Sequence, residues 1–250
     1  MQQYLLYAAK KHGFLVVLQA LDAEGKDGTI RHVMSAMNPQ GTVVTGFKEP
    51  TVLELDHDFL WRVHLHAPAK GAVAFFNRSH YEDVLIARVH QLVPKDQWSQ
   101  RYGNINDFEE LLYGQNNTRI VKFFLHISKE EQLQRFQQRL DDPARNWKTM
   151  KTITRNANSG MTIWRPSRTC SPRPARSTRP GTSFHRITMN HKWFRNLAVS
   201  QIVAETMEEM DLKMPEATVD LEVIRRKYHE AAEQMPARSK NKRGESTKKR

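Results

Sequence analysis

Continuous apolar runs constrain the fold of this chain more than any other feature. Residues 14–18 read FLVVL, and residues 72–76 and 120–127 form similar segments. A strand with apolar side chains on both faces needs cover on both faces, which is typical of a parallel sheet. Helical patterns separate these runs, so the sequence predicts an α/β fold of three α/β/α layers around a parallel sheet. Strands are expected at 14–18, 42–47, 72–76 and 120–127, and helices at 4–11, 29–37, 56–66, 79–91, 105–113, 129–140, 193–210 and 221–234.

The turn after the first predicted strand has the composition of a phosphate-binding loop. Residues 20–30 read ALDAEGKDGTI and lead into a predicted helix. Such a loop needs glycines where backbone amides approach phosphate oxygens, a lysine as a point charge, and a helix N-terminus beyond it. An ordinary charged turn is the alternative, because Ala20 stands where an opening glycine is expected. The residues predicted to bind phosphate are Gly25, Lys26, Asp27, Gly28 and Thr29.

Two carboxylates in the same turn predict a divalent cation. Asp22 precedes the glycine–lysine pair, and Asp27 stands where serine or threonine usually holds magnesium. Carboxylates beside bound phosphates would repel them unless a cation such as Mg²⁺ lay between them. We therefore expect Asp22 and Asp27 to bind Mg²⁺. No metal-ligand spacing connects the histidines His57, His80 and His126, for which structural roles are expected.

A second polar cluster follows the third predicted strand, at the same edge of the sheet. It begins at Asn77, and the guanidinium of Arg78 suits bidentate contact with a phosphate. Glu82 and Asp83 either hold metal-bound water or cap the next helix. Two further cations add positive charge over this edge or remain solvated at the surface: Lys48 and Arg62.

The formal charge of +12 is concentrated in two segments. Residues 149–189 carry eight Lys or Arg and no Asp or Glu, and residues 237–250 carry seven against Glu245 alone. The rest of the chain is therefore near neutral, which argues against a general design for binding nucleic acid. No run of about 18 apolar residues predicts a membrane span. The single cysteine and the lack of a signal peptide predict a cytoplasmic location.

Several long motifs, in order, resemble the polyphosphate kinase 2 family, in its subgroup that acts on nucleoside mono- and diphosphates. The resemblance covers about residues 4–148 and 190–228. It implies a P-loop kinase-like fold with a lid, Mg²⁺ as cofactor, a homo-oligomer, and reversible phosphoryl transfer between inorganic polyphosphate and an AMP- or ADP-type nucleotide. The motifs are LDAEGKDGTIRHV, GFKEPT, ELDHDFLWRVH, FFNRSHYEDVL, KFFLHISKEEQ and NHKWFRNLAVSQI.

The resemblance also implies roles for individual residues. Asp22, Lys26 and Arg78 would be catalytic, with Asp22 and Lys26 at the donor phosphates and the metal. Because an acceptor phosphate is already an oxyanion, the reaction needs alignment and charge neutralisation rather than a strong base. The residues expected around the acceptor nucleotide are Lys48, Arg62, Asn77, Arg78, Glu82 and Asp83. The cations expected at the polyphosphate rim of the lid are Arg135, Arg139 and Lys148. Asn77 stands where many P-loop enzymes carry a metal-binding aspartate, which weakens a metal role there.

The resemblance stops after Lys148 and resumes at Asn190, and the residues between are rich in Pro, Ser and Arg. Codons that the genetic code permits for these residues can be chosen and then translated in a shifted frame. Each shifted triplet joins the third base of one codon to the first two bases of the next. Residues 153–164 then give YKERELWDDY and residues 179–187 give PWYIVPSN, which resemble the family's lid helix and its last strand. We hypothesise two compensating frameshifts, with a divergent basic loop as the alternative. The coding DNA decides between them.

This segment affects the expected organisation and activity. Residues 1–236 are predicted to form the P-loop domain, and residues 237–250 a basic, disordered tail. With the lid helix lost, and one strand of the sheet at risk, kinase activity is expected to be weak or absent. The alternative function is an inactive remnant or a polyanion-binding protein. The tail would add nonspecific affinity for polyphosphate, with no specific nucleic-acid partner.

Overall fold

A parallel five-stranded sheet organises the chain up to Met214. The structure is a computed structural model that describes residues 1–20, 23–84, 94–144 and 181–233. The strand order β2-β3-β1-β4-β5 confirms the predicted α/β fold. The strands are β1 (Gly13–Ala20), β2 (Thr42–Gly46), β3 (Val73–Asn77), β4 (Thr118–His126) and β5 (Thr182–Thr188).

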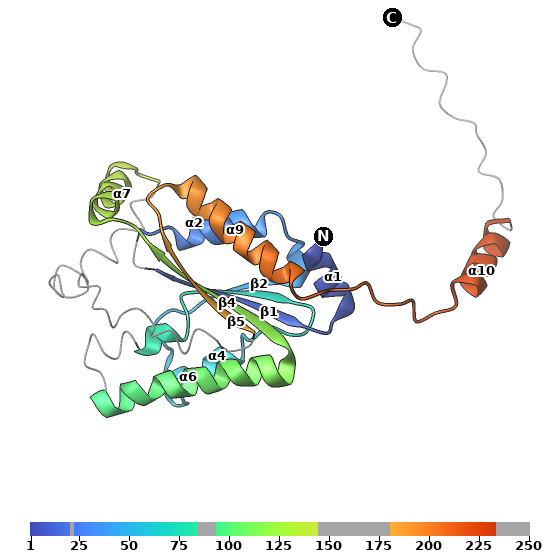
Figure 1. Cartoon of the computed structure of the whole chain (residues 1–250), viewed down its shortest axis with the longest axis horizontal. Helices are drawn as coiled ribbons and strands as arrows, with labels where there is room; N and C mark the ends of the chain where they lie inside the picture. Colours follow the sequence, from blue (N-terminus) through green and yellow to red (C-terminus); the bar gives the residue numbers. More distant parts are fainter. Residues whose placement is uncertain (21–22, 85–93, 145–180, 234–250) are drawn as a thin grey trace, which may run out of the picture. The chain divides into compact units, whose positions relative to one another are not determined.

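Helices cover both faces of this sheet (Figure 1). On one face lie α1 (Gln2–Ala9), α2 (Lys26–Met34) and α9 (Lys192–Glu208), and on the other α4 (Trp61–His64) and α6 (Lys95–Asn116). The remaining elements of this body are η1 (Pro39–Gly41), α3 (Val52–Leu55) and α7 (Lys129–Asp141). A separate unit begins at Pro215 and contains α10 (Leu221–Glu233). The sequence-based boundary after residue 236 stays a prediction.

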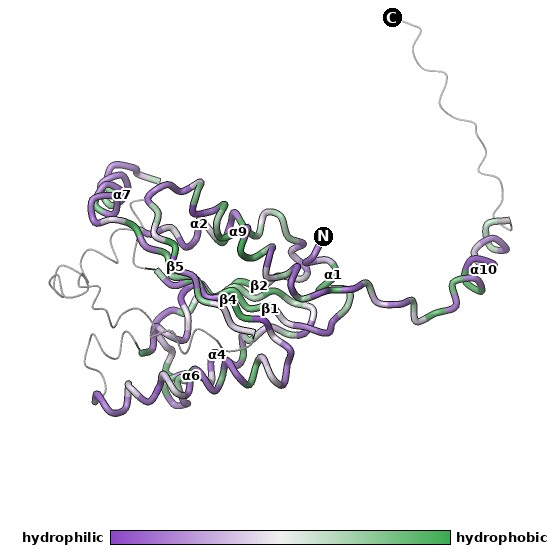
Figure 2. Tube along the Cα trace, in the orientation of Figure 1, coloured by the Kyte–Doolittle hydropathy of each residue, from purple (hydrophilic) through white to green (hydrophobic). Residues whose placement is uncertain are grey.

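The central strand β1 explains why the sheet is buried on both sides. Val16 and Leu18 pack against the residues of α2 and α9, while Leu15 and Val17 pack against those of α4 and α6. The apolar centre of the sheet is visible in the hydropathy colours of Figure 2. Burying apolar surface contributes about 25 cal/mol per Å² to the free energy of folding. Because β1 gains this contribution on both faces, the helices on both sides are held in place against it.

The parallel register brings the carboxyl ends of the strands to one edge. β1 pairs with β3 on one side, so that Leu18 lies opposite Asn77, and with β4 on the other, so that Ala20 lies opposite Leu125. Parallel sheets of this kind bind ligands at the carboxyl ends of their strands, where the strand order reverses. The loop after β1 lies at that place.

Two helix predictions were wrong in extent. Of the helix expected at 56–66 only α4 is present, because Asp58 Oδ1 accepts a hydrogen bond from Leu60 N and favours a turn there, and α3 lies before the predicted range. The helix expected at 105–113 begins ten residues earlier, at Lys95 directly after Pro94, and continues through Gly103. Helix propensity is a weak prior that tertiary packing overrides.

The strand considered at risk is present as β5. It pairs in parallel with β4, from Thr182 opposite Ile120 to Thr188 opposite His126. Two of its residues on the core face are polar: the buried hydroxyl of Ser183 has no hydrogen-bond partner among the described residues, and the ring of His185 stacks on Phe123, whereas Ile187 packs against the core. The backbone of β5 therefore completes the sheet, with polar side chains at two positions, Ser183 and His185, that face the core. The predicted loss of the lid helix concerns residues outside those that the structure describes.

The burial of His185 predicts that the stability of the folded chain falls in acid. Burial lowers the pKa of His185, so the folded chain favours the neutral ring. As the pH falls below about 6.5, the unfolded chain takes up a proton that the folded chain resists, and stability is lost. In urea denaturation, we expect native stability to fall more steeply from pH 7.5 to 5.5 than that of His185→Val. Equal pH slopes would contradict this prediction.

Candidate active site

The loop from β1 to α2 presents backbone amides at the ligand-binding edge. Helix α2 begins at Lys26 with Gly25 as its N-cap residue, so the helix N-terminus that the sequence predicted at Thr29 lies one turn earlier. Gly25 has a φ of +92°, and a Cβ at this position would collide with the guanidinium of Arg195. Lys26 Nζ donates to Ala20 O at 2.6 Å, which holds its charge over the end of β1. Asp22 lies outside the described residues.

Hydrogen bonds join this loop to the segment after β3. Asn77 Nδ2 donates to Asp27 Oδ1 at 2.9 Å. Gln19 Nε2 donates to Glu82 Oε1 at 2.7 Å, and Gln19 Oε1 accepts from Ser79 Oγ at 3.1 Å. The structure thus brings the predicted site residues Asp27 and Asn77 together, and it ties a third, Glu82, to Gln19 near the carboxyl end of β1. Gln19 was missed by the sequence analysis, although a polar residue near the carboxyl end of an apolar strand was a usable signal.

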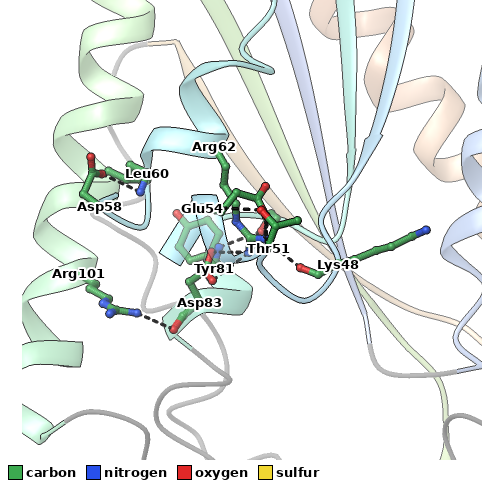
Figure 3. Close-up of polar contacts among 10 residues, drawn as sticks. Lys48, Thr51, Glu54, Asp58, Leu60, Arg62, Tyr81, Asp83 and Arg101 are labelled. Carbon is green, nitrogen blue, oxygen red and sulfur yellow. Dashed lines mark hydrogen bonds and ion pairs between the residues drawn. The ribbon is translucent and has the colours of Figure 1, made fainter. Parts of the chain in front are cut away.

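Lys48 and Arg78 are the exposed cations of the predicted acceptor cluster. Arg78 has a φ of +66°, an uncommon conformation for a residue other than glycine, directly after β3. In Figure 3 the side chain of Lys48 extends away from the surrounding polar contacts. Both cations therefore lie at the surface near the ends of β2 and β3.

Arg62 differs, because its guanidinium is buried and fully engaged. Its Nη2 donates to both carboxylate oxygens of Asp83, at 3.0 and 3.1 Å, and its Nη1 donates to Lys48 O at 2.9 Å (Figure 3). Arg101 donates to Asp83 O at 3.1 Å. Arg62 and Asp83 therefore tie the segment after β2 to the segment after β3. Their geometry is that of a structural support for the edge, rather than of groups open to an acceptor.

A buried ion pair also supports the segment after β3, through His80 and Tyr81. Lys122 Nζ lies 2.6 Å from Glu109 Oε2, and Glu109 Oε1 accepts from Tyr81 Oη at 3.0 Å and lies 3.2 Å from His80 Nε2. Burial would raise the pKa of Glu109, but the hydrogen bond from His80 and the charge of Lys122 outweigh it and lower the pKa to about 2. The stabilisation is present above the unfolded pKa and is lost as the pH falls from about 4.5 toward 2. Lys122 interrupts an apolar strand, which was the only sequence signal of this cluster.

Breaking this pair on one side is expected to destabilise the fold strongly. Lys122→Met leaves the Glu109 carboxylate buried without its cation, which costs about 3–5 kcal/mol. The double variant Lys122→Met/Glu109→Leu removes both charges and is expected to recover most of that loss. Urea denaturation at pH 7 measures both values. A double variant no more stable than the single one would contradict a dominant role for the unpaired charge.

The lid cations are placed differently from the prediction. Arg135 does not lie at a rim: its side chain is 7% exposed and its guanidinium donates to Ala23 O at 3.0 Å. The error arose because an arginine on an amphipathic helix has the same sequence pattern whether it faces solvent or the interior. Arg139 lies one turn later in α7, over the ring of Phe136. Lys148 lies outside the described residues.

The described residues could hold a magnesium ion only together with water and substrate phosphates. Among the described residues, no three His, Cys, Asp or Glu side chains gather in a way that could hold a metal ion. Asp27 supplies one carboxylate at the loop. Mg²⁺ commonly takes one or two carboxylates and completes its shell with water and substrate phosphates, so this donor set is compatible with the ion. In the described part of the chain, no helix is both long enough and apolar enough to cross a membrane.

The chain is similar to polyphosphate kinases in both sequence and structure. The sequence profile of the polyphosphate kinase 2 (PPK2) family matches residues 2–215. The AMP/ADP-polyphosphate phosphotransferase of Meiothermus ruber is 45% identical over 223 residues, which are 89% of this chain and 82% of that protein. The ADP-polyphosphate phosphotransferase of Rhodopseudomonas palustris is 42% identical over 86% of this chain and 78% of its own. The crystal structure of polyphosphate kinase 2 from Arthrobacter aurescens TC1 aligns with a TM-score of 0.80 and 37% identity, over 92% of this chain and 81% of that one.

Proposed function

This chain belongs to the polyphosphate kinase 2 family, and we propose that it transfers a phosphoryl group between inorganic polyphosphate and AMP or ADP, with Mg²⁺. The observation that carries the proposal is the hydrogen bond between Asp27 and Asn77. It joins the first turn of α2, which follows the phosphate loop, to the last residue of β3 at the ligand-binding edge of the sheet. Two anionic substrates could therefore meet over one set of amides and cations.

The residues of the site divide the work of the proposed reaction. The amides at the start of α2 and the ammonium of Lys26 bind the phosphates of the donor, because a helix N-terminus favours anions. The guanidinium of Arg78 binds the phosphate of the acceptor. Asp27 would hold Mg²⁺, which when bound neutralises charge between the two phosphates. The acceptor oxygen is already ionised, so these residues need only align it with the donor.

The test is the Mg²⁺-dependent formation of ATP from ADP and polyphosphate by the purified full chain. We expect slow formation of ATP, which EDTA abolishes and added Mg²⁺ restores. Turnover is expected to be low because residues 149–180 depart from the family's lid sequence. Binding of tripolyphosphate by calorimetry is measured in parallel. Tripolyphosphate binding without any ATP formation would favour the inactive, polyanion-binding alternative, and the absence of both would contradict the proposed function.

A further inference from the structure

Two buried guanidinium groups contact consecutive carbonyls of the phosphate loop. Arg135 Nη1 donates to Ala23 O at 3.0 Å, and Arg195 Nη1 donates to Glu24 O at 2.9 Å. The two arginines come from different helices, α7 and α9, and both residues are less than 7% exposed. Neither side chain is open to solvent. Arg135 Nε also donates to Glu131 Oε1 at 2.7 Å, and Arg195 Nη2 donates to Asn196 Oδ1 at 3.0 Å, so each arginine links the loop to its own helix.

The loop has a conformation that needs such support. Ala23 has a φ of +69° and Gly25 a φ of +92°. A non-glycine residue with positive φ is held at a cost of about 1–3 kcal/mol, and it persists only where the surroundings fix it. The N–H and C=O of a peptide point in opposite directions. Holding the loop carbonyls on one side therefore leaves the loop amides directed to the other side, where a phosphate would bind.

The side chain of Glu24 is a third anchor for the same loop. It is 1% exposed, and its Oε1 accepts from Ile127 N at 3.3 Å and lies 3.2 Å from His126 Nδ1. Arg135 also donates through Nη2 to Asn190 O at 2.7 Å. The loop is thus tied to the segments that follow β4 and β5, more than 100 residues away in the sequence.

Stability alone does not account for this arrangement. Burial and the nearby charge of Arg135 lower the pKa of Arg195 to about 10. Arg195 Nε has no hydrogen-bond partner among the described residues. Glu131 compensates the charge of Arg135 at 2.7 Å, but a second buried cation beside it is costly, and apolar replacements of buried charges are often neutral or stabilising. What the two cations supply is a pair of strong hydrogen bonds to the loop backbone.

We propose that Arg135 and Arg195 form an arginine clamp, a pair of positioning residues that hold the phosphate loop in the conformation in which its amides bind phosphate. That phosphate is the ligand of this loop rests on the proposed function. That the two arginines hold the conformation of the loop does not depend on it. The clamp contacts carbonyls and not the substrate. Lysine in either position keeps the charge but loses the fork that reaches two acceptors at once.

The test compares Arg135→Lys and Arg195→Lys in the full chain, with Arg119→Lys as the matched control. Arg119 pairs with Glu209 at the surface, at the opposite end of β4. We expect each clamp variant to weaken tripolyphosphate binding by about 10-fold or more, since a hydrogen bond from a charged donor contributes that much. We also expect hydrogen exchange of the Thr29 amide, which donates to Gly25 O at 3.1 Å, to rise by a similar factor, well below the unfolding midpoint. The control is expected to match the native chain in both measurements.

The two readouts separate the clamp from the proposed function. Clamp variants with a native exchange rate at the Thr29 amide would overturn the clamp, whatever they bind. Native exchange with weakened binding would also overturn it, because the arginines would then act on the ligand and not on the loop. A native chain that fails to bind tripolyphosphate would overturn the proposed function, while faster exchange in the clamp variants would still support the clamp. A merely structural role would lower the unfolding midpoint without selective exchange at the loop.

Discussion

Lys26→Ala is expected to lower the rate of ATP formation from ADP and polyphosphate by about 100-fold or more, the usual effect of removing one group that stabilises a developing oxyanion. Lys26 is the cation of the phosphate loop, at the N-terminus of α2, with Nζ held 2.6 Å from Ala20 O. Alanine leaves the loop amides in place but removes the charge that we propose binds the donor phosphates. Tripolyphosphate binding is expected to weaken in parallel, which keeps the test decisive even where turnover is low.

Lys70→Ala is the matched control for this experiment. Lys70 is exposed and precedes β3, at the end of the sheet opposite the phosphate loop. It removes the same charge without touching the site, so it should keep native turnover and native binding. Unfolding midpoints of both variants show whether the fold is intact. A Lys26→Ala chain that binds and turns over as the control does would refute the assignment of the loop.

Restoring the shifted reading frame is expected to raise both turnover and stability. The hypothesis of two frameshifts predicts that the coding DNA of residues 149–189 contains the strings YKERELWDDY and PWYIVPSN in one shifted frame. Once the DNA is read, the two single-base changes can be reversed. The restored chain is expected to turn over at least about 10-fold faster, because a lid excludes water and aligns the substrates.

The structure adds a physical reason to expect greater stability. In β5, Ser183 and His185 lie opposite Val121 and Phe123, which belong to the core. In the shifted frame, apolar residues fall at the start of this strand. Each apolar side chain gained on this face contributes about 1 kcal/mol, or about 2–4 °C in the unfolding midpoint for a chain of this size. The double variant Ser183→Val/His185→Val gains that stability without a lid, and so separates the two effects. Codons incompatible with both strings, or a restored chain no more active than the native one, would contradict the hypothesis.

The fold was predictable from the sequence because the signals for it are local. An apolar run such as residues 14–18 must be covered on both faces, and a glycine–lysine turn after it marks the ligand-binding edge. Neither inference needs knowledge of distant contacts. The presence of β5 was less predictable, because its side chains give no apolar pattern. It forms against β4 through backbone hydrogen bonds, which depend little on side-chain identity.

The positions of the arginines could not be read in the same way. Sequence reasoning placed Arg135 at a rim and Arg62 around an acceptor, and it gave no role to Arg195. In the structure Arg135 and Arg195 bind loop carbonyls, and Arg62 is engaged by Asp83. A guanidinium carries its charge at the end of a long stem, so its partner depends on which groups the fold brings within reach.

The parallel sheet, the glycine–lysine turn that contains Lys26, and the edge at which they meet all follow from local patterns in the sequence. Which cations are exposed at that edge, and which are buried against the loop backbone, follows from the tertiary structure alone. Arg195 lies 171 residues from the carbonyl that it binds. Apolar periodicity and turn chemistry act over a few residues along the chain. The environment of a charged side chain, by contrast, is set by groups that come together only when the sheet is assembled.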